Sequence, residues 1–110
     1  MYKILVPTDF SACATFAEDL ALSIAKKVEG EVHFYHRAAI PHNWKDITEN
    51  DKNRFPEIWD EVRSTELNLQ RCMVKAKEKQ VNSKRVYSHG KLIENVIDYV
   101  DTFDIDLIVM

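Results

Sequence analysis

Hydrophobic and polar residues alternate along the chain with two different periods, and these periods predict strands and helices in succession. Residues 2–6 (YKILV) form a short apolar run that predicts a strand, and residues 7–9 (PTD) predict a turn after it. Helical spacing follows, with Ser11 or Asp9 as the N-cap. Gly30 is expected to end this helix in the left-handed conformation. The predicted buried face of the helix contains Cys13, Ala17, Leu20, Ala21, Ile24 and Val28.

The rest of the chain continues this succession. The predicted elements are a strand at 31–38, a loop at 39–56, a helix at 57–80, a turn at 82–83, a strand at 84–89, a helix at 92–103 and a strand at 106–110. Trp44 is expected to hold the loop against the body of the protein. The polar strand 84–89 suits the edge of a sheet, whereas the apolar residues 107–110 predict a strand buried on both faces.

Alternation of strands and helices is typical of one architecture. It predicts an α/β fold in which a doubly wound, mostly parallel sheet is covered by helices on both faces. Ligands bind such sheets outside the carboxyl ends of the strands, at the point where the strand order reverses. We therefore expect a site near residues 7–9, residues 37–39, residues 89–90 and the chain that follows Met110.

Composition limits the classes of function. The chain has 110 residues, which predicts a single domain, and a net charge of −3, which gives no general electrostatic case for binding nucleic acid. No stretch approaches the roughly 18 apolar residues of a membrane span, and no signal peptide is recognised. These features predict a cytoplasmic protein with no membrane partner. The two cysteines, Cys13 and Cys72, are expected to be reduced and partly buried.

Several kinds of catalytic and cofactor chemistry are missing from the sequence. Only two glycines are present, and neither belongs to a GxGxxG or GxxxxGK[ST] motif, so no classical dinucleotide or Walker-type loop is predicted. The four histidines have no partners at zinc-binding spacing, and no GxSxG or HExxH motif occurs. The sequence therefore favours a protein that is not an enzyme.

Asp9 is the polar residue with the clearest functional interest. It follows a buried strand and precedes a helix, close to the expected crevice. Two compatible roles fit this position. Its carboxylate caps the helix by accepting amide hydrogens, or it accepts a hydrogen bond from a hydroxyl or amine of a small molecule.

Three segments together resemble the universal stress protein family. The opening KILVPTDFS, the second strand EVHFYHRA and the closing SHGKLIENVIDYVDTFDIDLIVM are similar to the corresponding family segments, and His36 matches a histidine of the family's second strand. The resemblance covers the whole chain. It implies the fold of the adenine-nucleotide α-hydrolases, with strand order 3-2-1-4. It also implies that the glycine-rich phosphate loop, final helix and final strand that family members carry after the methionine are missing here.

The resemblance further implies a function in the stress response and a pocket for ATP or AMP at the ends of the first and fourth strands. The residues that match the family's pocket are Pro7, Thr8, Asp9, Arg37 and Met110. Arg37 stands where the family usually has valine, so its guanidinium would either stack on a base or fill the pocket. Without the phosphate loop we expect weakened triphosphate binding, with AMP binding about as well as ATP.

One alternative function is left open by the resemblance. Some family members lack the glycine-rich loop, do not bind ATP and act by association. The exposed edge of the strand at 106–110 favours a homodimer or pairing with a partner protein. Adenine-nucleotide hydrolases share the fold, but the residues here supply no metal site and no charge stabilisation for a γ-phosphate, so hydrolysis is not expected.

Overall fold

The computed structural model describes residues 1–37, 44–88 and 92–110, and it contains a parallel sheet. Its strands lie in the order β3-β2-β1-β4, and each neighbouring pair is parallel. They are β1 (Lys3–Pro7), β2 (Glu31–Arg37), β3 (Asn82–Ser88) and β4 (Leu107–Ile108). The predicted strand order and the doubly wound α/β fold are confirmed. Because β1 and β4 are parallel, the carboxyl ends of both strands reach the same edge of the sheet.

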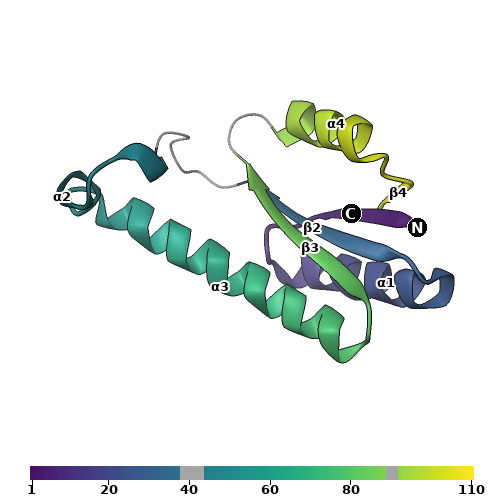
Figure 1. The fold of residues 1–110 in the computed structure, drawn as a ribbon. Coiled ribbons are helices and arrows are strands. Elements are labelled where there is room, and N and C mark those ends of the chain that lie inside the picture. The colour runs from purple at the N-terminus through teal and green to yellow at the C-terminus, as the bar shows by residue number, and fades with distance from the viewer. Residues whose placement is uncertain (38–43, 89–91) are drawn as a thin grey trace.

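Helices cover both faces of the sheet (Figure 1). Helices α1 (Ala12–Val28) and α3 (Pro56–Glu78) lie on one face, and α4 (Leu92–Phe103) lies on the other. A 3-10 helix, η1 (Trp44–Asp46), and the short helix α2 (Glu49–Lys52) precede α3. Within the described ranges, no helix is both long enough and apolar enough to span a membrane.

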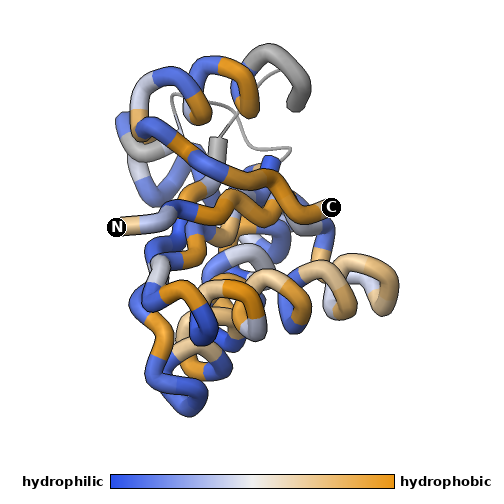
Figure 2. Tube along the Cα trace, turned by 90° about the vertical axis from the view of Figure 1, so that its right-hand side faces the viewer, coloured by the Kyte–Doolittle hydropathy of each residue, from blue (hydrophilic) through white to orange (hydrophobic). Residues whose placement is uncertain are grey.

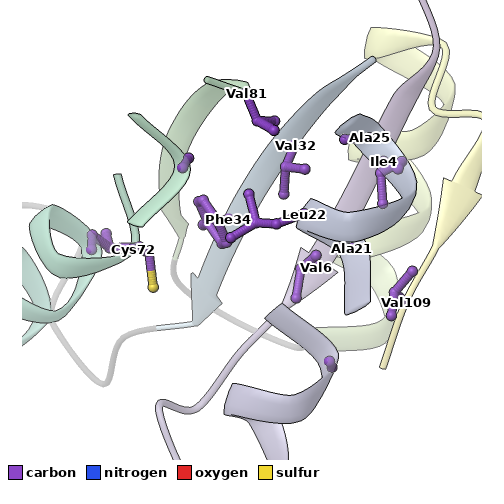
Figure 3. Packing of buried hydrophobic residues seen from close by; sticks show 13 residues of the cluster. Ile4, Val6, Ala21, Leu22, Ala25, Val32, Phe34, Cys72, Val81 and Val109 are labelled. Atoms are coloured by element: carbon purple, nitrogen blue, oxygen red, sulfur yellow. The ribbon is translucent and has the colours of Figure 1, made fainter. Parts of the chain in front are cut away.

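The hydrophobic core is divided by the sheet. In β1, Ile4, Leu5 and Val6 are fully buried, as expected for a strand covered on both faces. Ile4 and Val6 pack into the cluster beneath α1 and α3, whereas Leu5 packs on the α4 side. Figure 3 shows Leu22 of α1 beside Phe34 of β2 in the first of these clusters. Strand β1 therefore supplies side chains to both layers of the core.

The buried face of α1 differs from the predicted one. Cys13, Leu20 and Val28 are exposed, whereas Glu18 and Leu22 are fully buried. Hydrophobic and hydrophilic residues alternate along the helices around mainly hydrophobic central strands (Figure 2). The predicted face is correct for Ala17 and Ala21, which are buried, but the observed face is rotated to include Glu18 and Leu22 in place of Cys13, Leu20 and Val28.

The turn after α1 is also built differently from the prediction. Glu29, not Gly30, adopts the left-handed conformation, with φ 55° and ψ 39°. A Cβ atom on Gly30 would lie 2.5 Å from the carbonyl oxygen of Tyr2. Glycine is therefore needed for the close approach of two backbone segments, and not for a positive φ.

The segment before α3 is partly helical, although it was predicted as a loop. Of residues 39–56, those from 44 onward are described, and they contain η1 and α2. Trp44 is buried, as predicted, and its ring lies edge-on to Trp59 of α3 with 5.5 Å between centroids. Pro56 begins α3, at a position that the fixed φ of proline favours.

Two strand boundaries differ from the prediction. The turn predicted at 82–83 is wrong, because β3 begins at Asn82 and the chain turns at Gln80 with φ 59°. His89, the predicted end of that strand, lies outside the described residues. The short β4 is not buried on both faces: Ile108 is 40% exposed at the edge of the sheet.

Candidate functional site

A cavity of about 480 Å³ opens at the carboxyl ends of β1 and β2. All five site residues predicted from the sequence line it: Pro7, Thr8, Asp9, Arg37 and Met110. The structure thus brings together the turn after β1, the end of β2 and the chain after β4. The size falls in the range of roughly 300–1,000 Å³ that is usual for small-molecule sites. That these residues contact a ligand stays a prediction.

The helical wall of the cavity was not predicted. Cys13, Ala14 and Ala17 come from the first two turns of α1, and Tyr35 and His36 come from β2. Part of the signal was present in the sequence. Cys13 and Ala17 are four residues apart and share a helix face, and this helix starts directly after the predicted turn.

Short hydrogen bonds organise the turn between β1 and α1. Asp9 Oδ1 accepts from the amide of Ser11 at 2.9 Å, and Ser11 Oγ accepts from the amide of Ala14 at 3.1 Å. Ser11 is therefore the N-cap, while Asp9 stabilises the turn before it. The hydrogen bonds from Ser11, first its side chain and then its backbone, hold the pKa of Asp9 below its ordinary value. The exposed carboxylate is ionised at neutral pH and can accept further hydrogen bonds.

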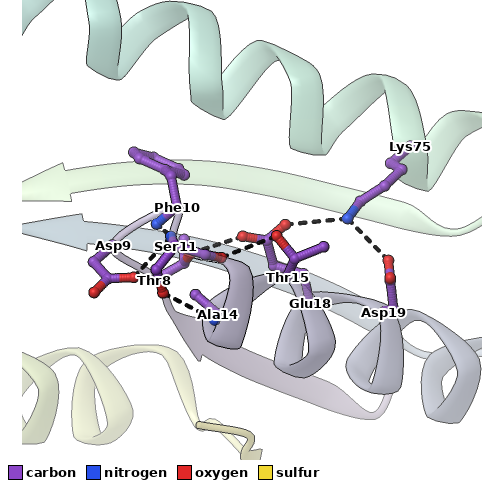
Figure 4. Close-up of polar contacts among 9 residues, drawn as sticks. All are labelled: Thr8, Asp9, Phe10, Ser11, Ala14, Thr15, Glu18, Asp19 and Lys75. Carbon is purple, nitrogen blue, oxygen red and sulfur yellow. Dashed lines mark hydrogen bonds and ion pairs between the residues drawn. The ribbon is translucent and has the colours of Figure 1, made fainter.

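Thr8 is hydrogen-bonded through its backbone and its side chain. Its amide donates to the carbonyl of Tyr35 at 2.8 Å, and its own carbonyl accepts from His36 Nδ1 at 2.8 Å. Its hydroxyl donates to Glu18 Oε2 at 2.7 Å and accepts from the amide of Phe10 at 3.0 Å (Figure 4). Phe10 has φ 63°, which is uncommon for a residue other than glycine. The turn is therefore held in one conformation by contacts on several sides.

A charged network lies behind this turn. Lys75 Nζ of α3 is 3.1 Å from Glu18 Oε1 and 2.9 Å from Asp19 Oδ1. Burial lowers the pKa of Lys75, but the hydrogen bonds that its ammonium group donates to Asp19 and Glu18 outweigh it, and the net change is upward. Burial, followed by the charge of Glu18, raises the pKa of the Cys72 thiol to about 12. Cys72 is thus a buried, unreactive thiol, whereas Cys13 is exposed, contrary to the prediction that both are partly buried.

The cavity combines apolar walls with two opposite charges. Pro7, Ala14 and Ala17 provide apolar surface, while Asp9 and Arg37 provide a carboxylate and a guanidinium. Apolar walls with a few polar groups are typical of sites for small molecules. Among the residues that the structure describes, no three histidine, cysteine, aspartate or glutamate side chains are grouped so that they could hold a metal ion.

Comparisons with known proteins agree with this geometry. The model of the universal stress protein family matches residues 1–110. A universal stress protein in complex with cAMP has a similar structure, with a TM-score of 0.75 at 19% identity, covering 99% of this chain and 75% of that one. UspA from Lactobacillus plantarum gives a TM-score of 0.75 at 24% identity, with 98% and 74% covered. A family protein from Arabidopsis thaliana with AMP bound gives 0.71 at 12% identity, with 100% and 77% covered. A comparison with curated protein sequences finds no match.

Proposed function

The chain belongs to the universal stress protein family, and on this premise we propose that it binds an adenine nucleotide, AMP or ATP, in the cavity at the carboxyl ends of β1 and β2. The observation that carries the proposal is the convergence of the predicted residues on one cavity of suitable size: Pro7, Thr8, Asp9, Arg37 and Met110. Structural neighbours in complex with cAMP and with AMP bound support the class of ligand.

Each wall of the cavity has a part in this proposal. The ionised carboxylate of Asp9 accepts a hydrogen bond from a ribose hydroxyl, because it is exposed and retains free lone pairs. The guanidinium of Arg37 stacks on the adenine ring, as planar guanidinium groups do on flat π-systems. Pro7 and Ala17 supply apolar surface for the other side of the ring.

The proposed role is binding without hydrolysis. Hydrolysis of a γ-phosphate needs a metal ion or several positive groups around the phosphates. Among the described residues that line the cavity, Arg37 is the one arginine or lysine side chain. For the same reason AMP should bind within a few-fold of ATP. A role in the stress response and a cytoplasmic location complete the proposal, and both rest on the family alone.

Cys13 provides a direct test, because it lines the cavity and is exposed while Cys72 is buried. Iodoacetamide should therefore alkylate Cys13 selectively at neutral pH. Saturating AMP should slow this alkylation several-fold by covering the thiol, and calorimetry should give a binding isotherm for AMP. Unchanged alkylation together with negligible heat at millimolar AMP and ATP would exclude nucleotide binding at this cavity.

A pair of aspartate variants makes the test specific to the site. Asp9→Ala should raise the Kd for AMP about tenfold. Asp98→Ala is the matched control, because Asp98 is exposed on α4, on the other face of the sheet. Equal affinities for the two variants would show that Asp9 makes no contact with the nucleotide.

A second candidate function is association with another copy of the chain, as in family members that act without nucleotide. It is favoured by exposed apolar side chains on α1 and at β4: Phe16 is 77% exposed, Leu20 55% and Met110 84%. In addition, β4 is an edge strand with few paired residues. Large apolar side chains on one flank and an open edge are features of surfaces that bind protein.

Sedimentation over a range of protein concentrations tests this second function. We expect a dimer that Phe16→Glu weakens by at least tenfold. Leu67→Glu serves as the control, because Leu67 is 72% exposed on α3 and remote from β4 in the fold. If the protein sediments as a monomer at millimolar concentration, the proposed self-association is contradicted.

A further inference from the structure

Glu18 is a carboxylate in a place where an apolar side chain would be expected. It is fully buried in α1, next to Ala17 and within a helix face that also buries Ala21 and Leu22. A buried carboxylate is unfavourable unless it is paired and hydrogen-bonded. Both of its oxygens have partners, so its position is determined by these contacts.

The partners of Glu18 come from two different parts of the fold (Figure 4). Its Oε1 accepts from Lys75 Nζ of α3 at 3.1 Å, and its Oε2 accepts from the hydroxyl of Thr8 at 2.7 Å. Thr8 lines the cavity, whereas Glu18 itself does not. A single side chain thus links α3 to the turn that forms one wall of the site.

The orientation of the Thr8 hydroxyl follows from this contact. Because the Thr8 hydroxyl donates to Glu18 Oε2, its single proton points to Glu18. The lone pairs of the hydroxyl are then free for the amide of Phe10, which donates to Thr8 Oγ1 at 3.0 Å. Phe10 is the residue with the left-handed φ of 63°. The Glu18 carboxylate therefore orients the Thr8 hydroxyl, and this hydroxyl accepts the hydrogen bond that holds Phe10 in its left-handed conformation.

We propose that Glu18, held by Lys75, is a positioning residue for the ligand site: it fixes the Thr8 hydroxyl and thereby the conformation of the turn from Thr8 to Ser11. Glu18 would not touch the ligand. Its effect on nucleotide affinity rests on the proposed function, but its effect on the turn does not. Asp19 is its natural control, because it pairs with the same Lys75 and is a carboxylate on the same helix.

Amide hydrogen exchange in the protein without ligand tests the positioning role. In Glu18→Leu we expect the amide of Phe10 to exchange at least tenfold faster than in the wild type, while core amides such as that of Val32 keep their rates. Asp19→Leu should leave the amide of Phe10 unchanged. Unchanged exchange at Phe10 in Glu18→Leu would overturn the proposal. A uniform rise in all amides would also overturn it, because that result indicates only lower global stability.

Variants of Thr8 provide an independent route if Glu18→Leu does not fold. Thr8→Val removes the hydroxyl and should speed exchange at Phe10 as Glu18→Leu does, whereas Thr8→Ser keeps the hydroxyl and should restore protection. Equal protection in Thr8→Val and Thr8→Ser would contradict the proposal.

Calorimetry with AMP then measures the consequence for the site. The Kd should rise about tenfold in Glu18→Leu and stay unchanged in Asp19→Leu. If the wild type binds AMP and Glu18→Leu binds it equally well, the positioning role is wrong. If the wild type gives no heat, the proposed nucleotide function fails, and the exchange experiment still decides the role of Glu18.

Discussion

The two faces of the sheet are attached to their helices in different ways. Between the sheet and helices α1 and α3, a continuous cluster of buried side chains runs through both helices and strands β1 and β2, and it includes Phe34 and Leu69. Among the described side chains on the α4 face, the buried cluster comprises Leu5, Tyr35 and Tyr99, with partly buried valines and an isoleucine around it. Within the described residues, the first face thus has the larger apolar cluster, whereas the second includes ring contacts of Tyr99 with Tyr35 and Phe103.

Among the described residues, each face also contains a buried polar link, a set of side chains joined by hydrogen bonds, and the two links reach opposite ends of the strands. The link on the first face ends at Thr8, in the wall of the cavity. On the second face, His33 Nε2 is hydrogen-bonded to Glu31 Oε1 at 2.7 Å, and His33 Nδ1 is hydrogen-bonded to the hydroxyl of Tyr99 at 2.6 Å. Glu31 is the first residue of β2, so it lies at the amino end of the strand, whereas the cavity opens at the carboxyl end. The geometry of the site and the attachment of α4 should therefore respond to different mutations.

The largest difference in the free energy of unfolding is expected between mutations in the two apolar layers. Phe34→Ala empties a fully buried position in the larger cluster and should lower the free energy of unfolding by about 3–5 kcal/mol. Val100→Ala on the α4 face removes a partly buried side chain and should cost about 1 kcal/mol. Urea unfolding of both variants measures the contrast, and equal losses would mean that the two layers are equivalent.

The ion pair between Glu18 and Lys75 gives the next largest expected effect on stability. Lys75→Met leaves the carboxylate of Glu18 buried without its cation and should destabilise the protein by about 2–3 kcal/mol, somewhat less than for a fully enclosed pair because Lys75 is 23% exposed. The double variant Glu18→Leu with Lys75→Met should recover most of this loss. Thermal or urea unfolding is the measurement, and a double variant no more stable than Lys75→Met would contradict the assigned pairing.

The polar link of the α4 face should matter for stability and not for the site. Burial, followed by the charge of Glu31, raises the pKa of Tyr99 to about 12, so its hydroxyl stays protonated and available to His33. Tyr99→Phe removes the hydrogen-bond partner of the buried Nδ1 of His33 and should cost about 1–3 kcal/mol. AMP affinity by calorimetry should be unchanged. A loss of affinity comparable to that of Glu18→Leu would show that the two links are coupled.

The smallest effect concerns the dependence of stability on pH. The hydrogen bond from His33 is the main cause that holds the pKa of Glu31 below its ordinary value of 4.5. A lowered pKa in the folded state contributes stability above pH 4.5, and this stability is lost as pH falls through the lowered pKa. Glu31→Gln should therefore be less stable than the wild type at pH 7, by up to about 1 kcal/mol, and the two should converge as pH falls through the lowered pKa of Glu31. A gap that is constant with pH, measured by urea unfolding, would contradict this assignment.

The fold and the position of the cavity could be predicted from the sequence because both follow from the alternation of strands and helices. The alternation of strands and helices predicted the parallel sheet, and the family resemblance gave its order. The carboxyl ends of β1 and β4 then had to meet at one edge, which placed Asp9 and Met110 in one cavity. These inferences need no knowledge of individual side-chain contacts.

The errors have a common physical origin in contacts between residues distant in sequence. Glu18 looks like a surface residue until Lys75, 57 positions away, is placed beside it, and this pairing rotates the buried face of α1. Gly30 looks like a helix C-cap until the carbonyl of Tyr2 is placed against it. The apolar run 107–110 looks like a strand buried on both faces, but Ile108 is 40% exposed in the edge strand β4. Local pattern cannot reveal a partner that only the tertiary fold supplies.

Titration of AMP followed by the backbone amide signals of the protein tests the nucleotide site most directly. Saturable shifts should be largest at Asp9, Ser11 and Arg37, which lie in the cavity wall, while Tyr99 and the rest of α4 remain unaffected. The absence of any saturable shift up to millimolar AMP, or shifts that are largest along α4, would contradict the assignment of the cavity.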